Sequence, residues 1–162
     1  MQHNLTRVFI HGLESSARGT KGSYFREHFP GMIIDDYRGT LDERMKQLHE
    51  TLEGMSNLLL VGSSYGGLMA SIFACEQPER VQKMLLLAPA LSLNEFRSYR
   101  EGSIDVPVII YHGLQDDVVP VEPVKAIAEK LFKNLEYNSI EDNHPLERYF
   151  KLLDWNRLLC YE

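Results

Sequence analysis

Short aliphatic runs alternate along the chain with segments whose apolar residues recur at helical spacing. The aliphatic runs are mostly continuous, which is typical of strands that are covered on both faces. We expect six strands, at residues 7–12, 31–35, 57–63, 83–90, 106–113 and 135–141.

Five helices are expected between and after these strands. Thr40 and Glu43 have the spacing of a capping box, and leucines and a methionine follow at helical spacing. The other helices are expected near the end of 15–29 and at 65–76, 122–132 and 146–153. Alternating strands and helices predict an α/β fold, a three-layer α/β/α sandwich with a mostly parallel six-stranded sheet. The length of 162 residues fits a single domain over 1–162.

Composition and charge argue against several classes of partner. The net charge of −6 is spread along the chain, whereas nucleic acids and anionic membranes bind basic patches. No apolar run reaches the length of about 18 residues that a membrane span needs. The two cysteines form no disulfide framework or metal cluster, and the first residues lack the pattern of a secretory signal. A cytoplasmic location is therefore the default expectation.

The stretch Gly62-Ser63-Ser64-Tyr65-Gly66 directly follows the third strand and fits the pattern Gly-x-Ser-x-Gly. In open parallel sheets, sites lie outside the C-terminal ends of the strands. A strand that turns into a helix within about one residue strains the backbone and raises the middle serine, Ser64, above the sheet. Side chains at Gly62 and Gly66 would collide in such a turn. A purely structural turn is the alternative; the sequence has no phosphate-binding glycine motif.

A serine hydroxyl needs a base to take its proton, usually a histidine that a carboxylate orients. His144 lies in a polar loop after the last strand, at the edge where Ser64 emerges. His112 ends a strand, and we expect it to be structural, with its ring tied to a nearby backbone group. The loop after the fifth strand offers Asp116 and Asp117 as the acid. A metal site built from His112, Asp116 and His144 is an alternative that no ligand spacing supports.

The order serine, acid, histidine and the motifs around it resemble the α/β-hydrolase superfamily over residues 6–150. The elbow at 62–66, the His11-Gly12 pair after the first strand and the stretch "HGLQDDVVP" at 112–120 carry the resemblance. This last motif selects Asp116 over Asp117. Asp35 stands where the family often has proline, and Asn143 departs from the small or acidic residue that usually precedes the histidine. "HGLESS" at 11–16 is also similar to compact, lidless esterases.

The resemblance implies a serine nucleophile, Ser64, with Asp116 and His144 completing the triad. It implies an oxyanion hole made by the backbone N–H groups of Tyr65 and Leu13, with Gly12 allowing a close approach of the first loop. We expect no cofactor and no metal. The pocket residues that we expect are His11, Leu91 and Phe96, with Leu13 and Tyr65 as further walls.

Residues 91–106 have no clear assignment and stand where larger relatives insert a lid. Leu91, Leu93, Phe96 and Tyr99 could form a short apolar flap there. The sequence thus predicts a hydrolase of small or short-acyl carboxylic esters or thioesters. An acyltransferase with the same triad and a non-catalytic binding protein of the same fold are the alternatives. The oligomeric state is not predicted.

Overall fold

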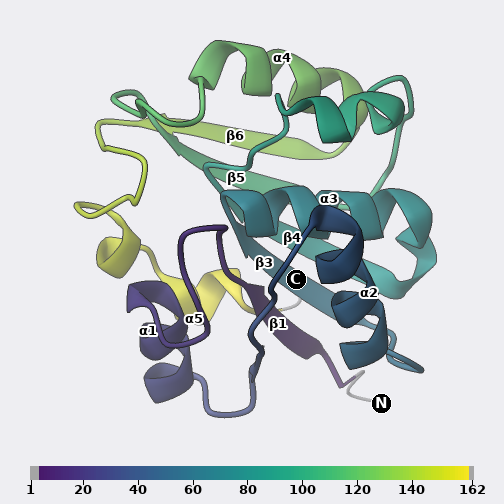
Figure 1. Cartoon of the computed structure of the whole chain (residues 1–162). Helices are drawn as coiled ribbons and strands as arrows, with labels where there is room; N and C mark the ends of the chain where they lie inside the picture. The colour runs from purple at the N-terminus through teal and green to yellow at the C-terminus, as the bar shows by residue number, and fades with distance from the viewer. Residues whose placement is uncertain (1–3, 161–162) are drawn as a thin grey trace.

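A computed structural model describes residues 4–160 of the chain. Residues 1–3, which belong to the N-terminal stretch inspected for a secretory signal, lie outside the described residues. The chain forms a six-stranded sheet in the order β2-β1-β3-β4-β5-β6, and every neighbouring pair is parallel (Figure 1). The predicted three-layer α/β/α architecture is confirmed. The strands are β1 (Thr6–Ile10), β2 (Ile33–Ile34), β3 (Leu58–Ser63), β4 (Val81–Leu87), β5 (Val108–Gly113) and β6 (Leu135–Ile140).

Helices cover both faces of the sheet because strand residues alternate between two apolar cores. Leu58 and Leu60 of β3 pack in the core with α2, α3 and α4, whereas Leu59 and Val61 pack in the other core with α1 and α5. The helices are α1 (Thr20–His28), α2 (Leu41–Thr51), α3 (Tyr65–Glu76), α4 (Val121–Leu131) and α5 (Trp155–Leu158); the 3₁₀ helices are η1 (Pro78–Arg80), η2 (Asn94–Tyr99) and η3 (Phe150–Leu152).

Local sequence signals set several of these boundaries. Helix α2 begins after Thr40, whose side chain accepts from the Glu43 N–H while the Glu43 carboxylate accepts from the Thr40 N–H; this confirms the capping box. Helix α3 has the predicted bounds. The prediction of a helix over 146–153 is wrong, since this segment holds turns and only η3. Leu146, where this helix would begin, takes a positive φ of 55°, which a residue within an α-helix does not adopt.

Residues 91–106 pack against the domain rather than standing apart from it. Phe96, within η2, is fully buried in the core that contains α3. Leu93 is 38% exposed, and Ile104 forms an isolated bridge with Phe132 beyond α4. The segment thus presents little of the apolar surface that the flap hypothesis requires.

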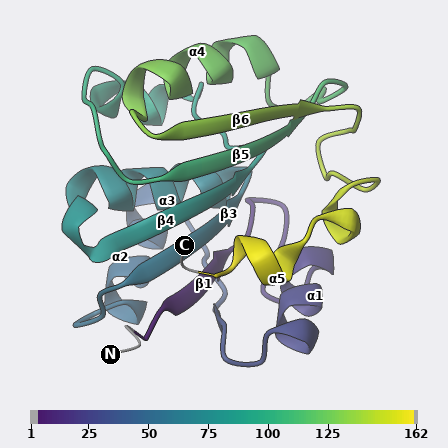
Figure 2. The ribbon, with the colours of Figure 1, turned by 180° about the vertical axis from the view of Figure 1, so that it is seen from behind.

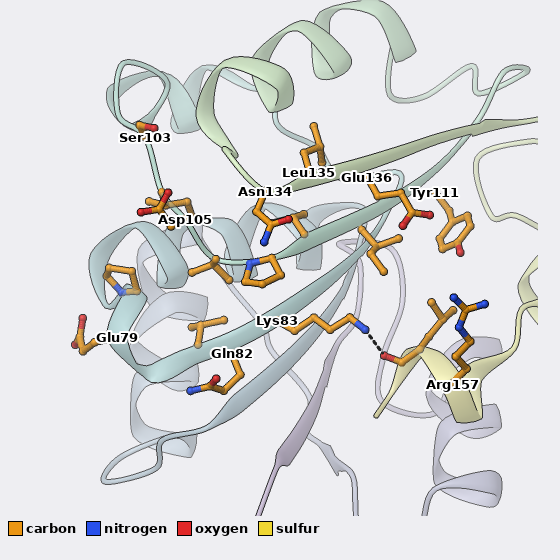
Figure 3. A pocket seen from close by; sticks show the side chains of 18 of the residues that line it. Glu79, Gln82, Lys83, Ser103, Asp105, Tyr111, Asn134, Leu135, Glu136 and Arg157 are labelled. Atoms are coloured by element: carbon orange, nitrogen blue, oxygen red, sulfur yellow. Dashed lines mark hydrogen bonds between the residues drawn. The ribbon is translucent and has the colours of Figure 1, made fainter. Parts of the chain in front are cut away.

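One face of the sheet is incompletely covered. Helices α1 and α5 lie over β1, β3 and β4, and Figure 2 shows β5 and β6 on the same side without a helix in front of them. A groove of about 920 Å³ runs there, between the first halves of β4, β5 and β6 and helix α5 (Figure 3). Within it, the Lys83 ammonium donates to the Leu158 carbonyl over 3.0 Å. Ser64, Asp116 and His144 are not among the residues that line this groove.

The strand order places a switch point between β1 and β3, because the connection from β1 leads to β2 on one side and the chain then returns to β3 on the other. Loops that leave a sheet at such a point diverge and open a crevice at the C-terminal strand ends. The loop that starts at His11 and the turn at Ser64 lie there. Among the described residues, no helix combines the length and the apolar character needed to cross a membrane.

Candidate active site

Ser64 occupies a strained backbone position between β3 and α3. Its φ of 55° and ψ of −111° lie outside the conformations that side-chain-bearing residues normally adopt. A Cβ on Gly62 would lie 2.5 Å from the Gly66 carbonyl oxygen, and one on Gly66 would lie 2.0 Å from the Ile10 carbonyl oxygen. Both glycines are therefore required by close backbone contacts, as the predicted turn demands.

Hydrogen bonds to the β4 end hold this turn in place. The Ser64 N–H donates to the Leu87 carbonyl over 2.9 Å, and the Ser64 carbonyl accepts from the Ala90 N–H over 3.0 Å. The same carbonyl accepts from Gly67 and Leu68 in the first turn of α3. These contacts stabilise a conformation that would otherwise be unfavourable.

Two backbone N–H groups near Ser64 are available to a ligand. Tyr65 is the first residue of α3, so its N–H has no carbonyl one turn earlier in the helix. No hydrogen bond within residues 4–160 uses the N–H of Leu13. A Cβ on Gly12 would lie 3.5 Å from the Ser64 Cβ, which shows how closely the first loop approaches the serine. These two amides are the groups that the resemblance assigns to an oxyanion hole.

Asp116 and His144 lie together, as their positions in the sequence predicted. The Asp116 Oδ2 lies 2.7 Å from the His144 Nδ1. The Asp116 side chain is fully buried, and that of His144 is 18% exposed. Asp117 is exposed. An imidazole whose Nδ1–H donates to a carboxylate has its Nε2 free to accept a proton.

Four donors surround the Asp116 carboxylate. Oδ1 accepts from the N–H groups of Val118 and Val119 over 2.9 and 2.7 Å, and Oδ2 lies within hydrogen-bond distance of both His144 and His112. Burial alone would raise the pKa of Asp116, but the hydrogen bonds from His144 and the two backbone amides outweigh it and hold the pKa below its ordinary value. The carboxylate is therefore ionised at neutral pH.

Ser64 and His144 are brought to the same sheet edge without a hydrogen bond between them. None of the hydrogen bonds within the described chain uses the Ser64 hydroxyl or the His144 Nε2. Catalytic hydrogen bonds are often long in free enzymes and shorten when substrate binds.

Sequence reasoning missed two features of this site. His112 does contact a backbone carbonyl, that of Val119 at 3.1 Å, but its Nε2 also lies 3.1 Å from the Asp116 Oδ2. Its Nδ1 lies 2.7 Å from the Tyr137 hydroxyl. The pairing of Ile110 with Tyr137 sets this contact, and no local motif in either strand indicates it.

The other missed feature is the anchor of the His144 loop. The buried Asp142 carboxylate accepts from the N–H groups of Asn143, Arg148 and Tyr149. The Lys21 ammonium of α1 donates to the Pro145 carbonyl over 2.7 Å, and burial lowers the pKa of Lys21. An acidic residue two positions before the histidine was the signal in the sequence.

The predicted pocket residues are less accessible than we expected. Leu91 and Phe96 are fully buried, and His11 is 2% exposed. The His11 Nε2 accepts from the Tyr37 N–H over 2.9 Å, and its Nδ1 lies 2.7 Å from the Gly12 carbonyl. His11 is thus buried and hydrogen-bonded within the protein, where it holds the first loop against the segment at Tyr37. Leu13, by contrast, is 49% exposed.

The described part of the chain holds no set of ligands for the metal site that we considered as an alternative. No group of three or more His, Cys, Asp and Glu side chains between residues 4 and 160 is arranged to hold an ion. The donors around Asp116 are N–H groups, which bind the carboxylate and not a cation.

Comparison with known families gives a match to one family model. Residues 41–146, which include the elbow, Asp116 and His144, match the model of the "Alpha/beta hydrolase family". Among curated proteins, the 2-hydroxy-6-oxo-6-phenylhexa-2,4-dienoate hydrolase of Comamonas testosteroni is 42% identical over 59 residues. That match spans 36% of this chain and only 20% of the relative's length.

Solved structures show the same fold over nearly the whole chain. A putative hydrolase from Agrobacterium vitis superposes with a TM-score of 0.77 at 20% identity, covering 96% of this chain and 88% of the other. The mouse alpha/beta hydrolase domain-containing protein 10 gives a TM-score of 0.73 at 20% identity, covering 96% and 86%. At this identity the likeness extends to the fold alone.

Proposed function

The chain belongs to the alpha/beta hydrolase family, and from this premise we propose that it is a serine hydrolase of carboxylic esters or thioesters. The observation that supports the proposal most directly is the 2.7 Å contact between Asp116 and His144, at the sheet edge where the strained turn presents Ser64. Family membership and fold alone would not distinguish an enzyme from a binding protein.

In the proposed acylation step, the Ser64 Oγ attacks the carbonyl carbon of the ester while its proton passes to the His144 Nε2. The carbonyl π electrons move to the oxygen, which the N–H groups of Tyr65 and Leu13 bind. When the tetrahedral intermediate collapses, the leaving alkoxide or thiolate takes the proton from His144. Asp116 keeps the Nδ1–H tautomer and stabilises the imidazolium.

The second half of the reaction repeats these roles with water as the nucleophile. His144 takes a proton from water, the hydroxyl adds to the acyl carbon, and the Ser64 Oγ leaves with the proton from His144. The products are a carboxylic acid and the free enzyme.

The substrates we propose carry a small acyl group, or an acyl group presented on a larger carrier at the protein surface. Leu91 and Phe96 are packed in the core and offer no channel for a long chain, while the exposed Leu13 offers a shallow apolar contact. Rates that rise steeply from four-carbon to sixteen-carbon esters would contradict this part of the proposal.

Labelling with a fluorophosphonate, read by intact mass, tests the function. A single adduct on the wild type that is absent from Ser64→Ala is the expected result, because only an activated serine attacks the phosphorus at a useful rate. The matched control is Ser63→Ala, which should still be labelled. A folded wild type without an adduct would favour the non-catalytic alternative. Products formed with added alcohol or amine would separate an acyltransferase from a hydrolase.

A further inference from the structure

A second histidine, His112, contacts the same Oδ2 oxygen of Asp116 that His144 contacts. His112 is fully buried, and the mechanism above does not use it. Building on the proposed serine hydrolase function, we propose that His112, held by Tyr137, is a positioning residue that fixes the Asp116 carboxylate toward His144. Neither residue touches the reacting atoms in this proposal.

The hydrogen-bond partners define how His112 is protonated. Its Nε2 faces two acceptors, the Asp116 Oδ2 and the Val119 carbonyl, both at 3.1 Å, so Nε2 carries the hydrogen. Burial lowers the pKa of His112, which leaves the ring neutral and Nδ1 without a proton. The Tyr137 hydroxyl at 2.7 Å then donates to Nδ1.

Tyr137 is a dependable donor because it stays protonated. Burial raises its pKa, and the nearby carboxylates of Glu122 and Glu129 on α4 and of Asp116 act in the same direction. The Lys125 ammonium, also on α4, lies 5.8 Å from the ring centroid. The result is a directed chain in which the Tyr137 O–H donates to His112 and the His112 Nε2–H donates to Asp116.

This chain has two consequences at Oδ2 of Asp116. First, with Oδ1 bound to the Val118 and Val119 amides, the His112 contact leaves the carboxylate no freedom to rotate away from His144. Second, a donor at Oδ2 withdraws negative charge from the atom that His144 contacts. Without that donor, Asp116 would hold a proton on His144 more tightly, and the base form would appear only at higher pH.

The test uses the full chain, with fluorophosphonate labelling rates measured across pH on three variants. His112→Leu removes the donor, His112→Gln returns an amide NH₂ that can reach both acceptors, and Tyr137→Phe removes only the hydroxyl. We expect His112→Leu to slow labelling about ten- to a hundredfold, since small misplacements of catalytic groups have effects of this size. We expect the pH of half-maximal labelling to rise by about one unit.

The conservative variants give the more specific readout. His112→Gln should label within about threefold of wild type, and Tyr137→Phe should label about three- to tenfold more slowly, the effect of one hydrogen bond. The pH midpoint should rise in Tyr137→Phe and return toward wild type in His112→Gln. A purely structural loss would lower the amount of active protein without moving this midpoint.

Thermal unfolding identifies any variant that does not fold. If His112→Leu fails to fold, Tyr137→Phe and His112→Gln decide the question by their midpoints. A labelled wild type with unchanged midpoints in the folded variants would overturn the positioning role alone. An unlabelled wild type would overturn the proposed function, and the positioning role with it.

Discussion

Gly66 of the elbow helix lies directly against the backbone of Ile10 at the end of β1, with no room for a side chain between them. This contact joins the serine turn to the strand that leads into the first loop. The position of the serine turn relative to the first loop thus depends on this one close backbone contact.

Gly66→Ala should therefore destabilise the protein strongly. The added methyl would meet the Ile10 carbonyl at 2.0 Å, and we expect a loss of about 3 kcal/mol in the free energy of unfolding, the upper end for overpacking. Urea unfolding measures the loss. Gly31→Ala is the matched control, because a Cβ there meets nothing within 4 Å. Equal stabilities of the two variants would contradict this account of the elbow.

Asp116→Asn should reduce ester hydrolysis and fluorophosphonate labelling by about 10³–10⁴, since an amide no longer holds the base in the correct tautomer. The effect should fall on kcat rather than on KM. Asp117→Asn is the neighbouring control and should stay within about twofold of wild type, as its exposed side chain is not hydrogen-bonded to His144. The proposed acid would be wrong if the two substitutions had interchanged effects.

Asp142→Ala should disturb the loop that carries His144. Three backbone N–H groups lose their acceptor, and we expect about 1–3 kcal/mol of destabilisation together with a lower kcat. Chemical denaturation and steady-state rates with a short-chain ester measure the two effects. Glu141→Ala, at an exposed position one residue earlier, should change neither by much.

The ionised Asp116 carboxylate should make stability depend on pH in a defined direction. Its pKa is lower in the folded protein, so its contribution is complete above the unfolded-state pKa of about 3.9 and is lost as pH falls through the folded-state pKa. The difference in unfolding free energy between wild type and Asp116→Asn should thus shrink as the pH falls from about 5 to about 2. A difference that stays constant over this range would show that the carboxylate is not selectively stabilised in the folded state.

His112 also lowers the free energy of unfolding as pH falls, because its pKa is lower in the folded state than in the unfolded state. Its effect does not cancel in the comparison, because the Asp116 contact raises the pKa of His112 and the substitution removes that contact. The contribution of the Asp116 carboxylate itself is therefore read at acidic pH, around and below its unfolded-state pKa of about 3.9. The effect of Asp36, whose pKa is lowered by the Ala17 N–H, does cancel, because both proteins retain Asp36 and its surroundings.

The sequence was most informative where short-range chemistry decides the structure. The Thr40 capping box, the bounds of α3 and the glycines of the elbow each follow from contacts within a few residues. The approach of Asp116 to His144 was also predictable, since both follow strands of one parallel sheet.

Long-range contacts account for what was missed. Tyr137 reaches His112 because β5 and β6 pair in one particular register, which alternation of apolar residues does not specify for a partly exposed edge strand. The helix expected over 146–153 does not form in this loop, where Leu146 takes a positive φ that nothing in its own sequence pattern indicates. Leu91 and Phe96 were correctly identified as apolar, but apolar residues serve a core as readily as a pocket.

The strand order has a consequence for the stage of synthesis and folding at which the Ser64 hydroxyl becomes activated. Ser64 leaves the central strand β3, whereas Asp116 and His144 follow β5 and β6, which are synthesised later than β3. On the proposed function, a growing chain carries an ordinary serine hydroxyl until β6 has paired and the following loop has docked. Nucleophilicity would then be acquired only after β6 has paired, so a growing chain that still lacks β6 would not react with the esters and thioesters around it.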